Sequence, residues 1–124
     1  MYLTVKKRND RYFTVLQDTA SIGISNGSHK PSVDVLFHSL AEIVGSDCIG
    51  VLLTGMGTDG AEGLKAIHDA GGETIVQDEE TSVVWGMPGA AVKLNAADHI
   101  VPLDQILMKL LHIIDNKTRQ INSK

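Results

Sequence analysis

The sequence predicts an α/β fold with a mainly parallel, doubly wound (Rossmann-like) sheet and an N-terminal antiparallel hairpin. Residues 2–16 alternate polar and apolar side chains around a turn, as two antiparallel strands do. From residue 32 to residue 115, short apolar segments alternate with segments whose apolar residues recur at helical spacing. Strands separated by helices pair in parallel through right-handed crossovers, so these residues predict successive βα units.

The hairpin is expected to pair strands at 2–7 and 11–16. The turn between them contains Asn9 and Asp10, residue types that favour tight hairpin turns. Residues 19–30 are polar and contain glycine, asparagine and serine, which predicts a loop.

A helix is expected to open at Pro31 and Ser32 and to end at Gly45 with a left-handed cap. Its side chains repeat at helical spacing and form one apolar stripe of Leu36, Phe37, Leu40, Ala41 and Val44. His38 lies off this stripe, so we expect it to be solvated.

The apolar run at 48–54 predicts a strand that is covered on both faces and central in its sheet. Its Cys48 is expected to be a buried, inert thiol, and a single cysteine excludes an internal disulfide. A central strand needs a neighbour on each side, and three short parallel strands supply too few. We therefore expect a partial domain, or a subunit that completes its sheet with a partner.

The remaining elements alternate in the same way. In chain order they are a helix from Gly60 to the glycines at 71–72, a strand at 74–76, an acidic turn at 78–80, a helix from Pro88 to residue 94, and a strand at 99–101. The last helix has an apolar stripe of Leu103, Ile106, Leu107, Leu110, Leu111 and Ile114. The polar tail over 116–124 is expected to fray.

Composition limits the classes of function. The chain has 124 residues, of which 43% are apolar and 21% charged, and this suits one folded domain with a core. A net charge of -4 argues against a general nucleic-acid or membrane surface. The basic cluster of Lys6, Lys7, Arg8 and Arg11 is expected to be a solvated hairpin end. The histidines lack zinc-ligand spacing, and without a signal-peptide block or an apolar run of about 20 residues the cytoplasm is the expected compartment.

The glycine-rich loop after the 48–54 strand allows two interpretations. Gly55-x-Gly57-x-x-Gly60 between a strand and a helix fits a dinucleotide-binding fingerprint, with Asp78 placed to bind a ribose. Asp59 opposes this interpretation, because its charge stands at the helix N-terminus where a pyrophosphate would bind. Two anions a few ångströms apart would repel each other by roughly several kcal/mol.

In the second interpretation Asp59 is itself the functional group. Amides at the helix N-terminus would hold its carboxylate, and the glycines allow a tight bend beyond the carboxyl end of the strand. Open α/β sheets build their sites at that edge. A fixed carboxylate there would orient a histidine and stabilise its imidazolium, as the acid of a catalytic triad does. The residues themselves leave a plain helix cap equally open.

Three motifs carry a family resemblance. The segments HKPSVDVLFHSLA (29–41), GVLLTGMGTDGAEGLKAIHDAGG (50–72) and QDEETSVVWGMPGAAV (77–92) resemble the catalytic domain of bacterial chemotaxis protein-glutamate methylesterases, the CheB-type enzymes. The resemblance implies hydrolysis of glutamate methyl esters on chemoreceptors, deamidation of glutamines in some members, and no metal or organic cofactor. Within the motif TGMGxDG, it makes Asp59 the triad acid and places Met56 beside the active site.

The resemblance leaves the other two triad members unassigned. In this family the serine nucleophile and the general-base histidine lie in motifs N-terminal to the region seen here, and this sequence contains neither motif. The other candidate serines and histidines have no suitable context; they are Ser32 with His29, His68, Ser82 and His99. Ser32 is better explained as a helix cap.

We therefore expect residues 1–124 to be the C-terminal part of a methylesterase catalytic domain, with little or no esterase activity by itself. Its expected partners are chemoreceptors and either the missing N-terminal part of the domain or a second copy of the chain. The alternative is a non-catalytic interaction or regulatory fragment.

Overall fold

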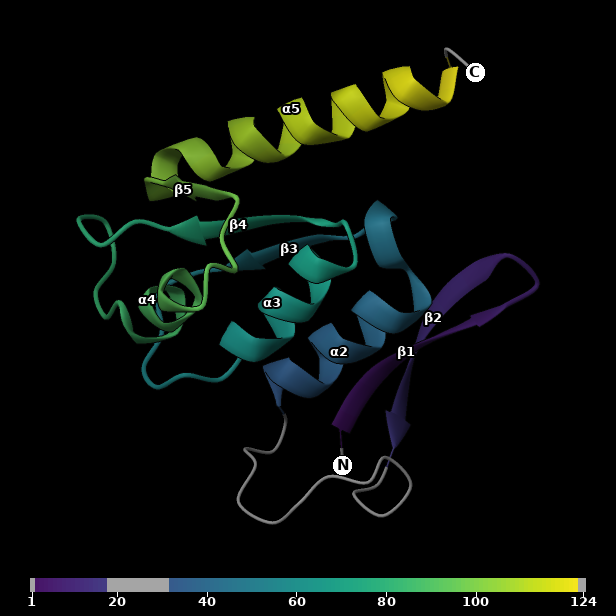
Figure 1. The fold of residues 1–124 in the computed structure, drawn as a ribbon, viewed down its shortest axis with the longest axis horizontal. Helices are drawn as coiled ribbons and strands as arrows, with labels where there is room; N and C mark the ends of the chain where they lie inside the picture. Colours follow the sequence, from purple (N-terminus) through teal and green to yellow (C-terminus); the bar gives the residue numbers. More distant parts are fainter. Residues whose placement is uncertain (1, 18–31, 123–124) are drawn as a thin grey trace.

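The computed structural model describes residues 2–17 and 32–122, and it confirms the α/β class (Figure 1). The N-terminal hairpin consists of β1 (Tyr2–Arg8) and β2 (Arg11–Gln17). A parallel sheet has the strand order β3-β4-β5, with β3 (Ile49–Leu52), β4 (Glu73–Gln77) and β5 (His99–Val101). The helices are α2 (Val33–Ile43), the 3-10 helix η1 (Gly45–Asp47), α3 (Ala61–Asp69), α4 (Gly86–Lys93) and α5 (Leu103–Asn122). The polar segment 19–30, predicted as a loop, lies outside the described residues.

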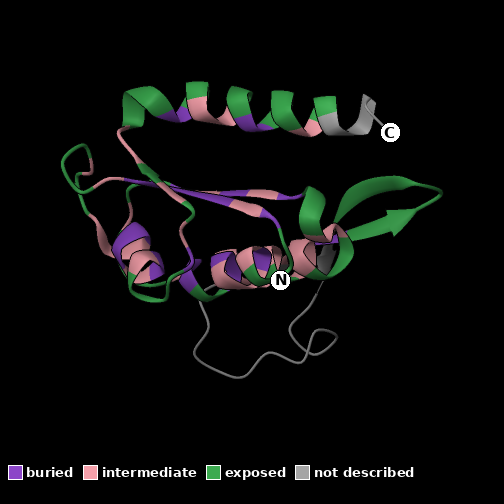
Figure 2. Cartoon of the chain, turned by 45° about the horizontal axis from the view of Figure 1, so that its top comes forward, coloured by how far each residue is buried: buried purple, intermediate pink, exposed green. Residues whose placement is uncertain are grey.

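Helices cover both faces of the parallel sheet, as a doubly wound fold requires. In Figure 1, α5 lies on one side of the strands and α2, α3 and α4 lie on the other. One buried cluster contains Leu52, Ala61, Leu64, Val76, Ala91 and Ala96, and the other contains Ile75, Ile106 and Ile113. Figure 2 shows this burial on the strands and on the helix sides that face them. The sheet is therefore the middle layer of three.

The hairpin is closed by a two-residue turn. Arg8 pairs with Arg11, and both residues between them have left-handed backbones, with φ of 52° at Asn9 and 63° at Asp10. Two positive φ angles define the turn whose twist matches that of the flanking strands. The hairpin is fixed to α2, where the Val5 amide donates to Ser39 Oγ at 2.9 Å.

The 48–54 strand is predicted to be covered on both faces and to have a neighbour on each side, and within the described residues it has the cover and one of the two neighbours. Here β3 pairs with β4 alone, and β4 is the central strand. The apolar run arises because β3 is covered on both faces: Gly50 lies against α3, while Ile49 and Val51 pack in the cluster that contains α5 residues. Cover by helices on both faces accounts for the apolar run, and the second neighbouring strand stays a prediction.

Both ends of α2 agree with the predicted caps, whereas the end of α5 differs from the prediction. Ser32 caps α2 by accepting from the Val35 amide at 3.3 Å, and Gly45 turns the chain away with φ of 66°. The tail predicted to fray from residue 116 is instead helical as far as Asn122. Lys117 Nζ donates to the Ser46 carbonyl at 2.7 Å, which ties this part of α5 to the body of the protein. No helix among the described residues has the length and apolar character needed to cross a membrane.

Candidate active site

The β3–α3 loop leaves the carboxyl end of β3 and turns sharply into α3. Gly57 and Gly60 have φ of 86° and 95°, a left-handed conformation that favours glycine. At Gly60 a side chain would also collide, since a Cβ atom would lie 2.8 Å from Leu52 and 3.0 Å from Val33. This close approach brings the start of α3 against the start of α2. Asp59 lies at this junction.

The Asp59 carboxylate faces inward and caps α2. Oδ2 accepts from the Val33 amide at 2.9 Å, and Oδ1 accepts from the Asp34 amide at 3.0 Å and from Ser32 Oγ at 3.2 Å. The sequence predicts that amides of the helix after Asp59, which is α3, hold this carboxylate; that prediction is wrong, because amides of α2 hold it. The positive end of the α2 dipole therefore supports this carboxylate.

Asp34, in α2, caps α3 in turn. Its Oδ1 accepts from the Gly60 amide at 3.0 Å and from the Gly63 amide at 2.7 Å. Burial raises the pKa of Asp34, and the nearby charge of Asp59 adds to that rise, while the two amide hydrogen bonds oppose it. Asp34, in the first turn of α2, thus caps α3, and Asp59, just before α3, caps α2, so the pair fixes both helix starts together.

Among the described residues, the hydrogen bonds to Asp59 leave one acceptor position of its carboxylate free. A carboxylate offers about four lone-pair sites, and three donors reach Asp59, two of them at Oδ1. Oδ2 therefore keeps one lone pair for a further donor. None of the three donors among the described residues is a histidine.

A second loop, from β4 to α4, is bonded to the Asp59 loop. Thr54 Oγ1 donates to the Val84 carbonyl at 2.8 Å and accepts from the Val84 amide at 2.9 Å. The Gly55 amide donates to the same carbonyl at 2.9 Å. The Gly55 carbonyl accepts from the amides of Gly86 and Met87 at 3.0 and 2.9 Å. The two loops are joined as one backbone framework.

Gln77 is the buried link within this framework, and sequence reasoning missed it. Its side chain is 1% exposed; Oε1 accepts from the Thr54 amide at 2.8 Å, and Nε2 donates to the Thr81 carbonyl at 2.7 Å. Its own carbonyl accepts from Trp85 Nε1 at 2.7 Å. The available signal was a polar residue directly after the apolar pair Ile75 and Val76 of β4, where a buried amide needs partners.

Apolar side chains stand exposed on these joined loops. Met56, predicted as a neighbour of the active site, is 80% exposed on the Asp59 loop. Val83 is 90% exposed on the second loop, and Leu53 and Val84 are also exposed. The loops present apolar atoms to solvent on a backbone held by hydrogen bonds.

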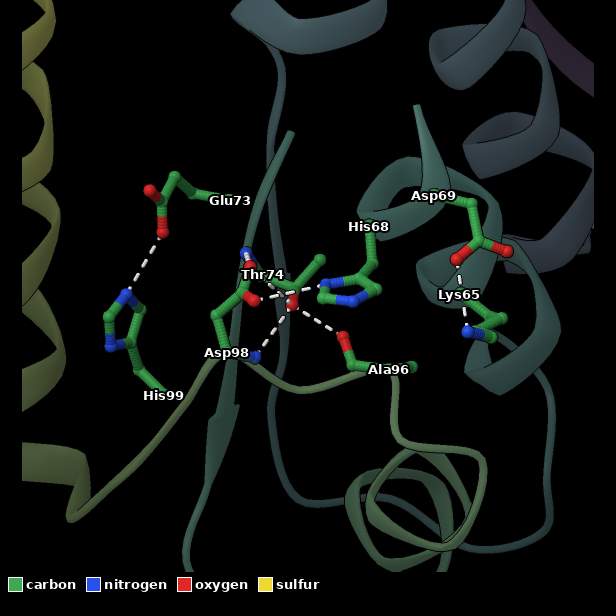
Figure 3. Close-up of polar contacts among 8 residues, drawn as sticks. All are labelled: Lys65, His68, Asp69, Glu73, Thr74, Ala96, Asp98 and His99. Atoms are coloured by element: carbon green, nitrogen blue, oxygen red, sulfur yellow. Dashed lines mark hydrogen bonds and ion pairs between the residues drawn. The ribbon is translucent and has the colours of Figure 1, made fainter. Parts of the chain in front are cut away.

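His68 and His99, which have no suitable sequence context, lie near the amino ends of the parallel strands (Figure 3). His68 Nδ1 lies 3.0 Å from Asp98 Oδ1, an ion-pair contact that lacks hydrogen-bond angles. His99 Nε2 lies 3.0 Å from Glu73 Oε2. Glu73 and His99 begin β4 and β5, whereas the Asp59 loop follows the end of β3. Neither histidine can serve Asp59.

The other candidates have local roles. Ser82 Oγ donates to the Asp78 carbonyl at 2.7 Å, and the Asp78 carboxylate accepts from the amide and hydroxyl of Thr81, which closes the acidic turn. Cys48 is buried and free, and burial raises the pKa of its thiol. His29 lies outside the described residues. Within the described ranges, no group of His, Cys, Asp and Glu side chains is arranged to hold a metal ion.

Comparison with known proteins gives concordant matches. A family model described as CheB methylesterase matches residues 2–110. A protein-glutamate methylesterase/protein-glutamine glutaminase of Hydrogenovibrio crunogenus is 50% identical over 113 residues, which are 91% of this chain and 29% of that protein. A second such protein, of Saccharophagus degradans, is 49% identical over 89% of this chain and 30% of its own length.

A solved structure agrees with these relatives. The crystal structure of the Thermotoga maritima CheB methylesterase catalytic domain superposes with a TM-score of 0.82 and 35% identity, over 90% of this chain and 57% of that one. The chain thus spans less than a third of the two relatives and a little over half of the catalytic domain.

Proposed function

Because the chain belongs to the CheB methylesterase family, we propose that it supplies the acid of a serine–histidine–aspartate triad to a protein-glutamate methylesterase of bacterial chemotaxis. The reaction would hydrolyse glutamate methyl esters on chemoreceptors and release methanol. The observation that carries the proposal is the Asp59 carboxylate, held by two backbone amides and a hydroxyl with one lone pair of Oδ2 still free.

The chemistry assigned to Asp59 follows from that geometry. The free lone pair of Oδ2 would accept from the Nδ1–H of the general-base histidine and so select the tautomer whose Nε2 faces the serine. When the histidine takes the serine proton, the fixed carboxylate would stabilise the imidazolium. The serine would then attack the ester carbonyl, methanol would leave, and water would hydrolyse the acyl-enzyme.

The serine and the histidine would come from the N-terminal part of the catalytic domain. No serine–histidine pair among the described residues faces Asp59, and loss of either residue from a triad costs on the order of 10⁶ in rate. The chain alone is therefore proposed to be inactive.

The exposed apolar side chains suit the proposed substrate contact. Met56 and Val83 stand on loops that are hydrogen-bonded to each other, next to the Asp59 junction. We assign Met56 to the wall of the active site, where it would contact the chemoreceptor segment that carries the ester. An apolar wall excludes water from the reacting carbonyl.

The unpaired side of β3 could bind a strand from the missing part of the domain. In the described residues β3 is hydrogen-bonded on one side only, to β4. An unpaired strand edge is a template for another strand. We propose that a strand of the N-terminal part pairs with β3 and brings the serine and histidine to Asp59. We place this assembly in the cytoplasm, where the buried Cys48 would remain a free thiol.

A second candidate function is a non-catalytic interaction module. It is favoured by the outer side of α5, where Leu103, Leu107, Leu111 and Ile114 are exposed at helical spacing. Such an apolar stripe is typical of a surface that another protein covers.

The test measures methanol release from methylated chemoreceptor by this chain and by a chimera in which the N-terminal part of the Hydrogenovibrio crunogenus relative precedes it. The chimera should turn over, the chain alone should not, and Asp59→Asn should lower the turnover of the chimera roughly 10⁴-fold. Circular dichroism would verify that the variant folds. Undiminished turnover in Asp59→Asn would show that Asp59 is only a helix cap. Turnover by the chain alone would refute the proposal that the serine nucleophile lies in the N-terminal part of the domain.

A further inference from the structure

The tip of the β1–β2 hairpin concentrates positive charge on an otherwise acidic protein. Four of the eleven Lys and Arg residues lie at positions 6–11, and Asp10 is the one acidic residue in that segment. The other fourteen acidic residues lie elsewhere in the chain. In Figure 1 the tip projects away from the helices, and Figure 2 colours it as exposed.

The register places like charges against each other. Arg8 lies directly opposite Arg11, and Lys6, two residues along the same face, lies opposite Phe13. Like charges directly opposite in an antiparallel pair are destabilising. Among residues 2–17 and 32–122, no carboxylate forms an ion pair with Lys6, Arg8 or Arg11. The fold keeps an unfavourable arrangement that a ligand with negative charge would relieve.

Aromatic rings accompany the charges. Tyr12 and Phe13 are 47% and 42% exposed, and Lys7 Nζ lies 5.4 Å from the centre of the Tyr12 ring. A hollow of about 510 Å³ at the tip is lined by Arg8, Asn9, Arg11, Tyr12 and Phe13. Phe13 shares a face of the hairpin with Arg8 and Arg11, so that face offers guanidinium groups for carboxylates and ring surface for apolar side chains together.

We propose that the hairpin tip is a docking surface for an acidic polypeptide segment of a partner protein. Arg8 and Arg11 would bind its carboxylates, and Phe13, on the same face of the hairpin, would pack against its apolar side chains. The inference is independent of the role of Asp59.

A polypeptide fits this surface better than the other polyanions. Tyr12 and Phe13 point to opposite faces of the hairpin, because neighbouring residues of a strand alternate. The tip therefore lacks the single apolar face with which interfacial segments enter a membrane. The acidic remainder of the chain would repel the long phosphate backbone of a nucleic acid.

The test is fluorescence anisotropy with a labelled peptide of Glu-Glu-Leu-Ala repeats, and the same repeat with Gln in place of Glu as its control. The chain should bind the Glu peptide, and R8Q/R11Q should weaken that binding about tenfold. K93Q/K109Q removes the same charge from α4 and α5 and should leave it unchanged. Binding should also weaken as salt is added.

Three results would overturn the proposal. The first is equal binding of the Gln peptide, and the second is equal loss of binding in K93Q/K109Q. The third is an effect of R8Q/R11Q on phosphatidylserine vesicles or on an oligonucleotide with none on the Glu peptide, which would assign the tip to a membrane or to a nucleic acid.

Discussion

The two edges of the parallel sheet both carry carboxylates in polar networks, but the networks differ in one respect. At the amino edge the acids and histidines are paired with each other, as in His68 with Asp98 and His99 with Glu73. At the carboxyl edge Asp59 is held by backbone amides and keeps an acceptor position free. The proposed site is therefore distinguished by an acid that is held in place with an open acceptor position, and not by a histidine beside an acid.

The largest expected difference is between the reaction rates of variants with a substitution at one edge or the other. In the chimera, Asp59→Asn should lower kcat/KM roughly 10⁴-fold because the amide favours the wrong histidine tautomer. Asp98→Asn should leave kcat/KM unchanged, since Asp98 stands at the opposite edge. Methanol release under identical conditions compares them. A large loss of rate in Asp98→Asn would remove the distinction between the two edges.

The next effect is on stability and concerns the glycine that joins α3 to α2. Gly60→Ala should lower the free energy of unfolding by about 3 kcal/mol, because it combines a left-handed backbone with collisions against Leu52 and Val33. Gly57→Ala is the matched control, since it has a similar φ and no atom within 4 Å of the added Cβ. It should cost about 1 kcal/mol.

Urea unfolding of the two glycine variants measures this difference. Equal losses would show that backbone conformation alone fixes the Asp59 loop, and that the close approach of α2 and α3 adds nothing.

Substitutions of Gln77 and Thr74 should have similar effects on stability but different effects on kcat. Gln77→Leu leaves the Thr54 amide and the Thr81 carbonyl without their partner and should cost about 1–3 kcal/mol of stability. Thr74→Val, at the amino edge, removes hydroxyl contacts with Ala96 and Asp98 and should cost a similar amount. In the chimera, only Gln77→Leu should also lower kcat, by roughly tenfold or more, because it releases the loops beside Asp59. Equal kcat in both variants would contradict this role.

The smallest effect is the pH dependence of Asp34. Burial raises its pKa above the ordinary value of 3.8, so the folded protein binds this proton more tightly than the unfolded chain does. The stabilising contribution of the group is present below its unfolded pKa and is lost as pH rises through its folded pKa. The stability of wild type relative to Asp34→Asn should therefore fall over that interval, as measured by urea unfolding at a series of pH values. A relative stability that rises over this interval would contradict the upward direction of the Asp34 pKa shift.

Sequence reasoning placed Asp59 in a tight loop between a strand and a helix, but it did not identify the amides that hold the carboxylate. The strand–loop–helix pattern and the glycines are local, so the loop could be placed from residues 48 to 60 alone. The partner helix could not, because the exchange of caps depends on α2 lying close to Gly63, where a Cβ would come 2.6 Å from the Cβ of Phe37. That contact joins residues far apart in the chain.

Two further differences have the same origin in distant contacts. The polar residues after Asn116 gave no sign of the bond from Lys117 to the Ser46 carbonyl. Gln77 was missed because a single amide in a strand says nothing about which loops it will join.

The exchanged caps have a consequence for anyone who would transplant this acid into another scaffold. A β3–α3 loop moved by itself would carry Asp59 without its socket, which is built from Ser32, Val33 and Asp34. It would also arrive with bare amides at Gly60 and Gly63. The smallest unit that could be transplanted is therefore the pair of α2 and α3 with the loop between β3 and α3. A relative that has lost Asp34 or Asp59 is expected to have lost or replaced the other as well.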